Sequence, residues 1–505
     1  MSVIRSSLLV GVGAGASRIL GFVRDVLFAQ ALGAGPVADA FLAAFRLPNL
    51  VRRVVGEGGL NPALVPALGG LDGQAAARTA GDVVTLFALA LLALTGVVEI
   101  GAGLLALALA PGLADEPDTL GLVALYTRLA FPSVIVITLA SIGAALLNIH
   151  RRYSAASLAP LAVNGGLILT ILLLERRFSL PLSEKAAWLA GASSIAGLVQ
   201  LIIVALAIRG SGLVRFGKPV WSPALKNLLL AGFPALVASG AVQLFVLVGT
   251  QVASFWPSGV SWLYYADRVV QLPLGLMAAL ASSVLLPELA ARFRTGERRR
   301  LLDAQNRAIG LGLLLAVPAA VALWCLADPI ASVLFRRGAF DDADVAGTAL
   351  VLMGLSLGLP AATLAKVLSQ TLFAKGALRG TVMAAIAGIG TTGLFAYGFG
   401  TIFGVFGLAV GISLGCLVHA GVLALLLDRA GLWLLDRALL LRTLRIAGAS
   451  LLMGAVLVAG RHAVPEPGFV ALALLCAGGL AVYGAAAWLF GALTLGDLAP
   501  LAKKT

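Results

Sequence analysis

Charged residues are scarce in this chain. Only 12% of its 505 residues are Asp, Glu, Lys or Arg, whereas 60% are apolar. Soluble domains carry roughly 25% charged residues, so this composition excludes an ordinary soluble protein. The apolar runs are about 20 residues long and do not alternate with a period of two, which excludes a membrane β-barrel and predicts membrane-spanning α-helices.

Cysteine and histidine are also rare, with three of each. Cys325, Cys416 and Cys476 lie in apolar segments without a CxxC pair, and we interpret them as small core residues. The scattered histidines do not predict a zinc site. No nucleophile motif, metal cluster or nucleotide loop appears, since GVGAGAS at 11–17 lies in an apolar span and follows no strand. We therefore expect neither an enzyme nor a cofactor, and no cleavable signal peptide.

The apolar segments predict an all-α polytopic membrane protein with fourteen transmembrane helices. The predicted spans are 5–31, 36–66, 79–110, 122–149, 155–175, 186–208, 224–254, 260–290, 303–326, 344–373, 380–398, 404–427, 441–460 and 469–492. With this count, 21 Lys and Arg residues flank the spans on the side of the termini and six on the other side. The positive-inside rule then places both termini in the cytoplasm. The net charge of +13 has the same origin, and no nucleic-acid-binding motif accompanies it.

A faint internal repeat divides the spans. Span 2 has Asp39 followed by Pro48, and span 8 has Asp267 followed by Pro273. Charged, proline-kinked helices at the second position of two halves are typical of a duplicated transporter. We predict an N-lobe over 1–210, a C-lobe over 211–430 and a C-terminal pair of helices over 431–505. The basic segment VRFGKPVWSP, between spans 6 and 7, is expected at the membrane interface.

Residues 17–66 carry the unusual charges. This stretch has the apolar content of two spans, yet it holds eight charged residues: Arg18, Arg24, Asp25, Asp39, Arg46, Arg52, Arg53 and Glu57. An Arg at a bilayer centre costs roughly 2.5–3.5 kcal/mol, so five facing lipid would cost on the order of 15 kcal/mol. A water-filled cavity with a positive wall avoids that cost, and Arg suits phosphate because its planar fork bonds two oxygens at once.

The acids in this stretch leave two interpretations open. They either form part of the binding site or only neutralise the arginines in a structural network. Helical spacing places Arg18 and Asp25 on one face, with Arg24 pointing elsewhere. Among the other charges inside spans, Arg268 is expected to face the cavity, Arg128 and Arg307 to snorkel, and Lys366 to serve either the cavity or an ion pair.

The segments SRILGFVRD, DAFLAAFRLPNLVRR, EGGLNPALVP and SWLYYADR resemble the MurJ (MviN) family of lipid II flippases, in the MOP exporter superfamily. The resemblance implies two six-helix lobes in a V around a central cationic cavity, plus two C-terminal helices that form a groove for the lipid tail. It implies alternating access that moves undecaprenyl-pyrophosphate-linked disaccharide-pentapeptide to the outer leaflet of the bacterial inner membrane. Membrane lipids and the cell-wall synthesis machinery are the other implied partners, nucleic acid is not, and a monomer is expected.

By the same resemblance, Arg24, Arg52 and Arg268 are expected to engage the pyrophosphate. The full set of expected substrate-binding residues is Arg18, Arg24, Asp25, Asp39, Arg52, Arg53, Glu57 and Arg268. Some family members bind sodium through acids on spans 7, 11 and 12, but no Asp or Glu lies inside those spans here. Sodium coupling at that position is therefore not expected.

Three other functions are compatible with parts of the pattern. An exporter of another polyprenyl-linked oligosaccharide would also present a pyrophosphate, and only the motifs favour lipid II. A multidrug antiporter of the same superfamily moves cations, which a surplus of arginine disfavours. A non-transporting scaffold for cell-wall enzymes would not need buried arginines.

Overall fold

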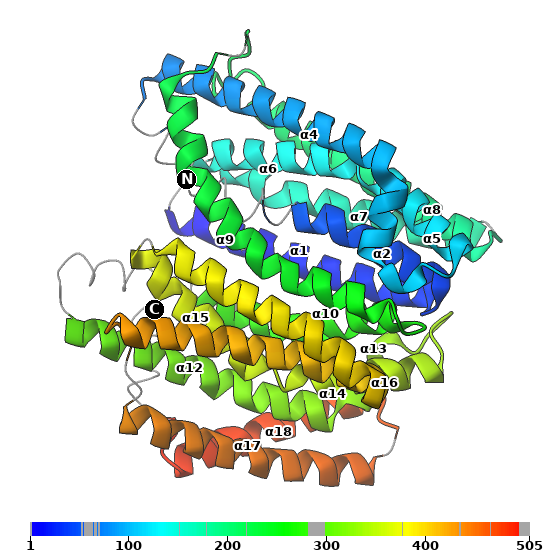
Figure 1. Ribbon diagram of the computed structural model, residues 1–505, viewed down its shortest axis with the longest axis vertical. Coiled ribbons are helices and arrows are strands. Elements are labelled where there is room, and N and C mark those ends of the chain that lie inside the picture. Colours follow the sequence, from blue (N-terminus) through cyan, green and yellow to red (C-terminus); the bar gives the residue numbers. More distant parts are fainter. Residues whose placement is uncertain are drawn as a thin grey trace. The chain divides into compact units, whose positions relative to one another are not determined.

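A computed structural model describes residues 3–51, 54, 64, 68, 71–150, 152–177, 179–218, 220–280, 298–375, 377–433, 436–464 and 466–493. All regular structure in these residues is helical, as predicted (Figure 1). Within a bilayer, a lone apolar segment must satisfy its backbone N–H and C=O groups internally, and a helix does this.

The chain divides into two compact units. The first unit, residues 1–261 with 337–340, holds α1 (Val3–Leu32), α2 (Pro36–Val51), α4 (Gly73–Leu109), the 3-10 turn η2 (Pro111–Leu113), α5 (Pro117–Ala130), α6 (Ser133–Ile149), α7 (Tyr153–Arg177), α8 (Leu182–Ile208) and α9 (Pro223–Ala253). The second unit holds most of α10 (Gly259–Leu280), then α12 (Arg298–Cys325), α13 (Ala327–Phe335), α14 (Asp342–Ser356), α15 (Leu359–Lys375), α16 (Leu378–Arg429), α17 (Arg437–Ala463) and α18 (Phe469–Leu489).

Each unit has its own core. In the first, α7 packs against both α1 and α8, and α2 packs against α5. The rings of Phe28, Phe41, Phe45 and Tyr126 form a cluster there, with centroids 4.5–6.3 Å apart. In the second unit α12 packs against α15 and α17, and α16 against α14 and α15. The division of the chain into lobes at 1–210, 211–430 and 431–505 stays a prediction.

Several helices begin at side-chain caps. Ser222 accepts the Leu225 N–H before α9, and Asp436 accepts the Leu439 N–H before α17 at 2.6 Å. Asp341 and Asp344 form a capping box at the start of α14. These oxygens satisfy backbone donors that the first turn of a helix leaves without partners.

Two predicted spans depart from one regular helix, which their hydropathy does not reveal. In the span 122–149 the helical hydrogen-bond ladder is interrupted at Phe131–Pro132, because proline has no N–H, but both residues keep helical dihedral angles and the segment remains one candidate span. The span 344–373 is two helices, α14 and α15, bent by 46°, and Ser413 of α16 donates a 2.7 Å hydrogen bond to the Gly354 carbonyl near the bend. The separately predicted spans 380–398 and 404–427 are two helices that share the label α16 and meet at a kink, where Phe403 and Gly404 have non-helical dihedral angles.

Eight helices in the described part of the chain are long and apolar enough to cross a membrane, or nine when the bent pair α14–α15 is counted as one span. The chain is therefore a multi-pass membrane protein, and the count of fourteen stays a prediction. The predicted span bounds agree with the described helices to within a few residues at most ends. The short helix α13 was not predicted, because nine residues are too few for a spanning pattern.

The predicted topology can be checked by labelling. With both termini in the cytoplasm, a cysteine at Asp118 in intact cells should react with a membrane-impermeant thiol reagent, and one at Thr505 should react only after the membrane is opened. A parallel experiment on the parent chain measures the background from its three cysteines. Equal labelling of both positions in intact cells would contradict the fourteen-span arrangement.

Candidate functional site

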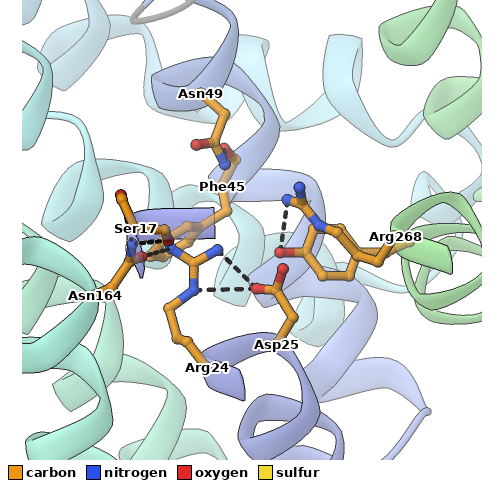
Figure 2. Close-up of polar contacts among 8 residues, drawn as sticks. Ser17, Arg24, Asp25, Phe45, Asn49, Asn164 and Arg268 are labelled. Atoms are coloured by element: carbon orange, nitrogen blue, oxygen red, sulfur yellow. Dashed lines mark hydrogen bonds and ion pairs between the residues drawn. The ribbon is translucent and has the colours of Figure 1, made fainter. Parts of the chain in front are cut away.

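Arg24 of α1 is the centre of a network of polar side chains from α1 and α7. Its Nε and Nη2 donate to Oδ1 of Asp25 at 3.0 and 2.7 Å, and its Nη1 donates to Oδ1 of Asn164 at 2.9 Å (Figure 2). Its guanidinium carbon also lies 5.4 Å from the centre of the Phe28 ring. Asp25 is buried and the Arg24 side chain nearly so. Two edges of the guanidinium group are thus held in a fixed orientation.

Asn164 belongs to α7, which packs against α1. Its amide nitrogen donates to the Ser17 carbonyl at 3.0 Å, while its amide oxygen accepts from Arg24. One side chain therefore links two turns of α1 to the neighbouring helix. Figure 2 shows the dashed contacts that Asn164 makes with Ser17 and Arg24.

The expected phase of these charges was partly wrong. Arg24 does not point away from Asp25, because its long side chain places the guanidinium group against the neighbouring carboxylate. Arg18 is exposed on the same helix. The Arg24–Asp25 pair has a simple energetic reason: a buried carboxylate without a cation would be very costly in a low-dielectric environment.

On α2, Asp39 and Arg46 are both buried, and Asp39 is only 2% exposed. The Asp39 carboxylate accepts two hydrogen bonds from Ser261, from its backbone N–H at 2.8 Å and from its hydroxyl at 2.5 Å. Ser261, at the start of α10, thus holds the Asp39 carboxylate through two hydrogen bonds. Arg52, Arg53 and Glu57, which complete the predicted set, lie outside the described residues.

In the second unit, Arg268 lies on α10 and contacts Tyr264 one turn earlier. Its Nη2 donates to the Tyr264 hydroxyl at 2.9 Å, and its guanidinium carbon lies 4.5 Å from the centre of that ring (Figure 2). The tyrosine holds the arginine by a hydrogen bond and a cation–π contact together. Beside it on α10, Gln271 donates to Asp267 at 2.5 Å.

The remaining cations inside spans behave differently. Arg128 and Arg307 are exposed, and Nε of Arg128 donates to the Glu99 carbonyl; that these side chains snorkel stays a prediction. Lys366 donates to the Leu274 carbonyl at 3.3 Å, so its described contact is with backbone. Among the described residues there is no group of three or more His, Cys, Asp or Glu side chains able to hold a metal ion.

Sequence reasoning did not predict the side chains that hold the arginines. Asn164 and Tyr264 lie in apolar segments, and Ser261 is an ordinary small polar residue. A signal for Asn164 was available, since an amide in the middle of a span must find a partner inside the protein. Its partner could not be named without the packing of α7 on α1.

The fold and these charged groups define a polytopic helical membrane protein with arginines held by polar side chains inside its spans. The family profile described as "Lipid II flippase MurJ" matches residues 28–477, and the chain belongs to that family. A protein of Rhizobium tropici named "Probable lipid II flippase MurJ" is 33% identical over 519 residues, covering 98% of this chain and 96% of its own length.

Solved structures show the same fold. The structure titled "Lipid II flippase MurJ, inward closed conformation" has a TM-score of 0.80 at 23% identity and covers 96% of this chain and 98% of its own. An inward-facing multidrug resistance MATE transporter of the MOP superfamily has a TM-score of 0.69 at 18% identity, covering 82% of this chain and 94% of its own. The fold is thus shared by flippases and drug transporters, and does not by itself select between them.

Proposed function

We propose that this chain is a lipid II flippase that moves the undecaprenyl-pyrophosphate-linked precursor of peptidoglycan from the inner to the outer leaflet of the bacterial inner membrane. Family membership supports this function. The single structural observation that carries it is Arg24, whose guanidinium group is held by Asp25 of α1 and Asn164 of α7. The proposed route is alternating access, with the headgroup in a cavity and the polyprenyl tail in lipid.

The proposed ligand of the arginines is the diphosphate. Arg24, Arg52 and Arg268 bind its oxygens, and Arg18, Asp25, Asp39, Arg53 and Glu57 complete the site. When the diphosphate arrives at Arg24, its oxygens replace the Asp25 carboxylate as acceptors of the guanidinium hydrogen bonds. This exchange is feasible because a planar carboxylate and a tetrahedral phosphate can each accept two parallel hydrogen bonds from the planar guanidinium group. Asn164 keeps the guanidinium group in place during this exchange. The protein acts as a monomer, with both termini in the cytoplasm.

Depletion of the protein tests the function directly. Peptidoglycan synthesis should stop while lipid II accumulates on the cytoplasmic leaflet, and re-expression of the parent chain should restore outward movement. Lipid II that reaches the outer leaflet at an unchanged rate after depletion would refute the proposal. Increased efflux of cationic drugs from cells that express the chain would instead support the multidrug antiporter.

Transport is expected to continue when sodium is replaced by potassium. No Asp or Glu lies inside predicted spans 7, 11 and 12, so an acid-built sodium site is not available there. An electrogenic step would still respond to the membrane potential, because one charge crossing the field is worth roughly 2.3 kcal/mol per 100 mV. The measurement is lipid II movement in proteoliposomes with each cation in turn; strict dependence on sodium would show that carbonyl or hydroxyl oxygens form a site.

A further inference from the structure

The segment 209–222 joins α8 to α9 and lies against the beginning of α4. The backbone N–H of Arg215 donates to the Ala77 carbonyl at 2.9 Å, and the backbone N–H of Val220 donates to the Asp82 carboxylate at 3.4 Å. The Arg78 side chain donates to the Lys218 carbonyl. We call this segment the α8–α9 strap. Leu213 and Val214 pack against the core, whereas the side chains from Arg215 to Lys218, Val220 and Trp221 are exposed.

Two glycines make the contact between strap and helix possible. A Cβ on Gly81 of α4 would collide with the Arg215 carbonyl, and a Cβ on Gly217 of the strap would collide with the Arg78 guanidinium group. The first collision is with the backbone of the strap, and the second is with the flexible end of the side chain that bonds the Lys218 carbonyl. The strap is therefore a fixed surface feature with a defined outward face.

The outward face combines large apolar side chains with basic ones. Phe216 is 68% exposed and Trp221 is 64% exposed, with Val220 exposed between them. Arg209, Arg215, Lys218 and Lys226 are exposed as well, and no acidic residue occurs from 209 to 226. A water-facing loop gains nothing from exposed aromatic rings, whereas aromatic and basic side chains together suit the headgroup level of an anionic bilayer.

The position of the strap along α8 supports the same environment. Exposed apolar side chains continue to the last turns of α8, at Ile203 and Leu206, and the helix ends at Ile208. The strap begins at the next residue, where the lipid-facing surface of α8 stops. Its side chains therefore start at the boundary between hydrocarbon and headgroups.

We propose that the α8–α9 strap is a binding surface for anionic phospholipid headgroups. Phe216 and Trp221 insert among the upper parts of the acyl chains, and Arg215 and Lys218 bind the lipid phosphates. This surface is separate from the arginines of α1, and its function does not depend on which substrate those arginines bind.

The test uses the full-length protein in nanodiscs of phosphatidylcholine alone or mixed with phosphatidylglycerol. The chain has seven tryptophans, so the Trp221 signal is the fluorescence of the parent minus that of Trp221→Phe. With phosphatidylglycerol present, lipids brominated near the headgroup should quench this signal strongly, and iodide in the water should quench it weakly. The double variant Arg215→Gln/Lys218→Gln should lose most of the quenching that phosphatidylglycerol adds.

The matched control is Arg379→Gln/Arg429→Gln. It removes two exposed basic side chains at the ends of α16, on the same predicted side of the membrane, and should leave the Trp221 signal unchanged. Gly81→Ala keeps every charge, but its Cβ would collide with the Arg215 backbone carbonyl and displace the strap from α4, so it should also reduce the quenching. Quenching by iodide but not by bromolipids would overturn the proposal, as would protection from both, which would mean that another protein surface covers the strap. Equal losses of quenching in the two double variants would show that only the net charge of the protein matters, and would overturn the proposal as well.

Discussion

Alanine at Arg24, Arg52 or Arg268 is expected to abolish complementation of a strain depleted of its own flippase, while each variant still inserts into the membrane. A guanidinium–phosphate contact in a partly desolvated site is a charge-assisted hydrogen bond, typically about 1.5–3 kcal/mol. One lost contact then weakens binding by roughly 10- to 150-fold. Loss of Arg24 also leaves the buried Asp25 without its described cation, which adds a cost in stability.

Substitution by lysine at the same positions distinguishes an arginine that binds the diphosphate from one that only balances a nearby negative charge. Lysine keeps the positive charge but loses the planar fork, so it should be damaging where two oxygens of the diphosphate are bound at once. We expect impaired complementation by Arg→Lys at two or more of the three positions. At Arg268 lysine also loses the planar contact with the Tyr264 ring.

The measurement is lipid II binding by the purified variants, together with their thermal stability. Arg128→Ala and Arg307→Ala are the controls, because both side chains are exposed, and they should bind lipid II nearly as the parent does. A contrary result would be Arg24→Ala and Arg52→Ala variants that bind lipid II as tightly as the parent but unfold more easily. The arginines would then be structural, and the proposed ligand contacts would be wrong.

The helices were predictable from the sequence because an apolar segment in a bilayer must satisfy its backbone hydrogen bonds internally, and an α-helix does so. Hydropathy located α7, α8, α12 and α18 to within a few residues. It could not locate the bend between α14 and α15, where Leu357 and Gly358 are as compatible with a continuous apolar run as their neighbours. A bend of this kind is fixed by tertiary contacts such as Ser413 to the Gly354 carbonyl.

The charged residues of the candidate site were also predictable, because an arginine inside a span has a high free-energy cost in the bilayer and therefore indicates a special environment. The side chains that form hydrogen bonds with these arginines were not predictable. Helical phase predicted that Arg24 would point to another face of α1 than Asp25. The two side chains nevertheless form a hydrogen bond, because the several rotatable bonds of arginine let its guanidinium group lie away from the direction of the Cα–Cβ bond. Asn164 is 140 residues away from Arg24 along the chain, and only the packing of α7 on α1 brings them together.

Asn164→Ala is expected to reduce lipid II binding roughly tenfold, although Asn164 is a positioning residue and not a proposed ligand. Its amide oxygen accepts from Nη1 of Arg24, and a hydrogen bond to a charged group is worth about 1.5–3 kcal/mol. Without it, the guanidinium group keeps its contacts with Asp25 but can rotate about them. Asn164→Asp should be worse than Ala for binding, because a second carboxylate beside Arg24 competes with the diphosphate for the same cation.

A double-mutant cycle distinguishes this role from simple packing of α7 on α1. If Asn164 acts through Arg24, the loss in lipid II binding caused by Asn164→Ala should disappear when Arg24 is already alanine, whereas its effect on thermal stability should persist. Thr170→Val is the matched control on α7, because the Thr170 hydroxyl bonds only the Gly166 carbonyl of its own helix among the described contacts, and it should leave binding unchanged. Additive losses in lipid II binding from Asn164→Ala and Arg24→Ala would mean that Asn164 does not position the arginine.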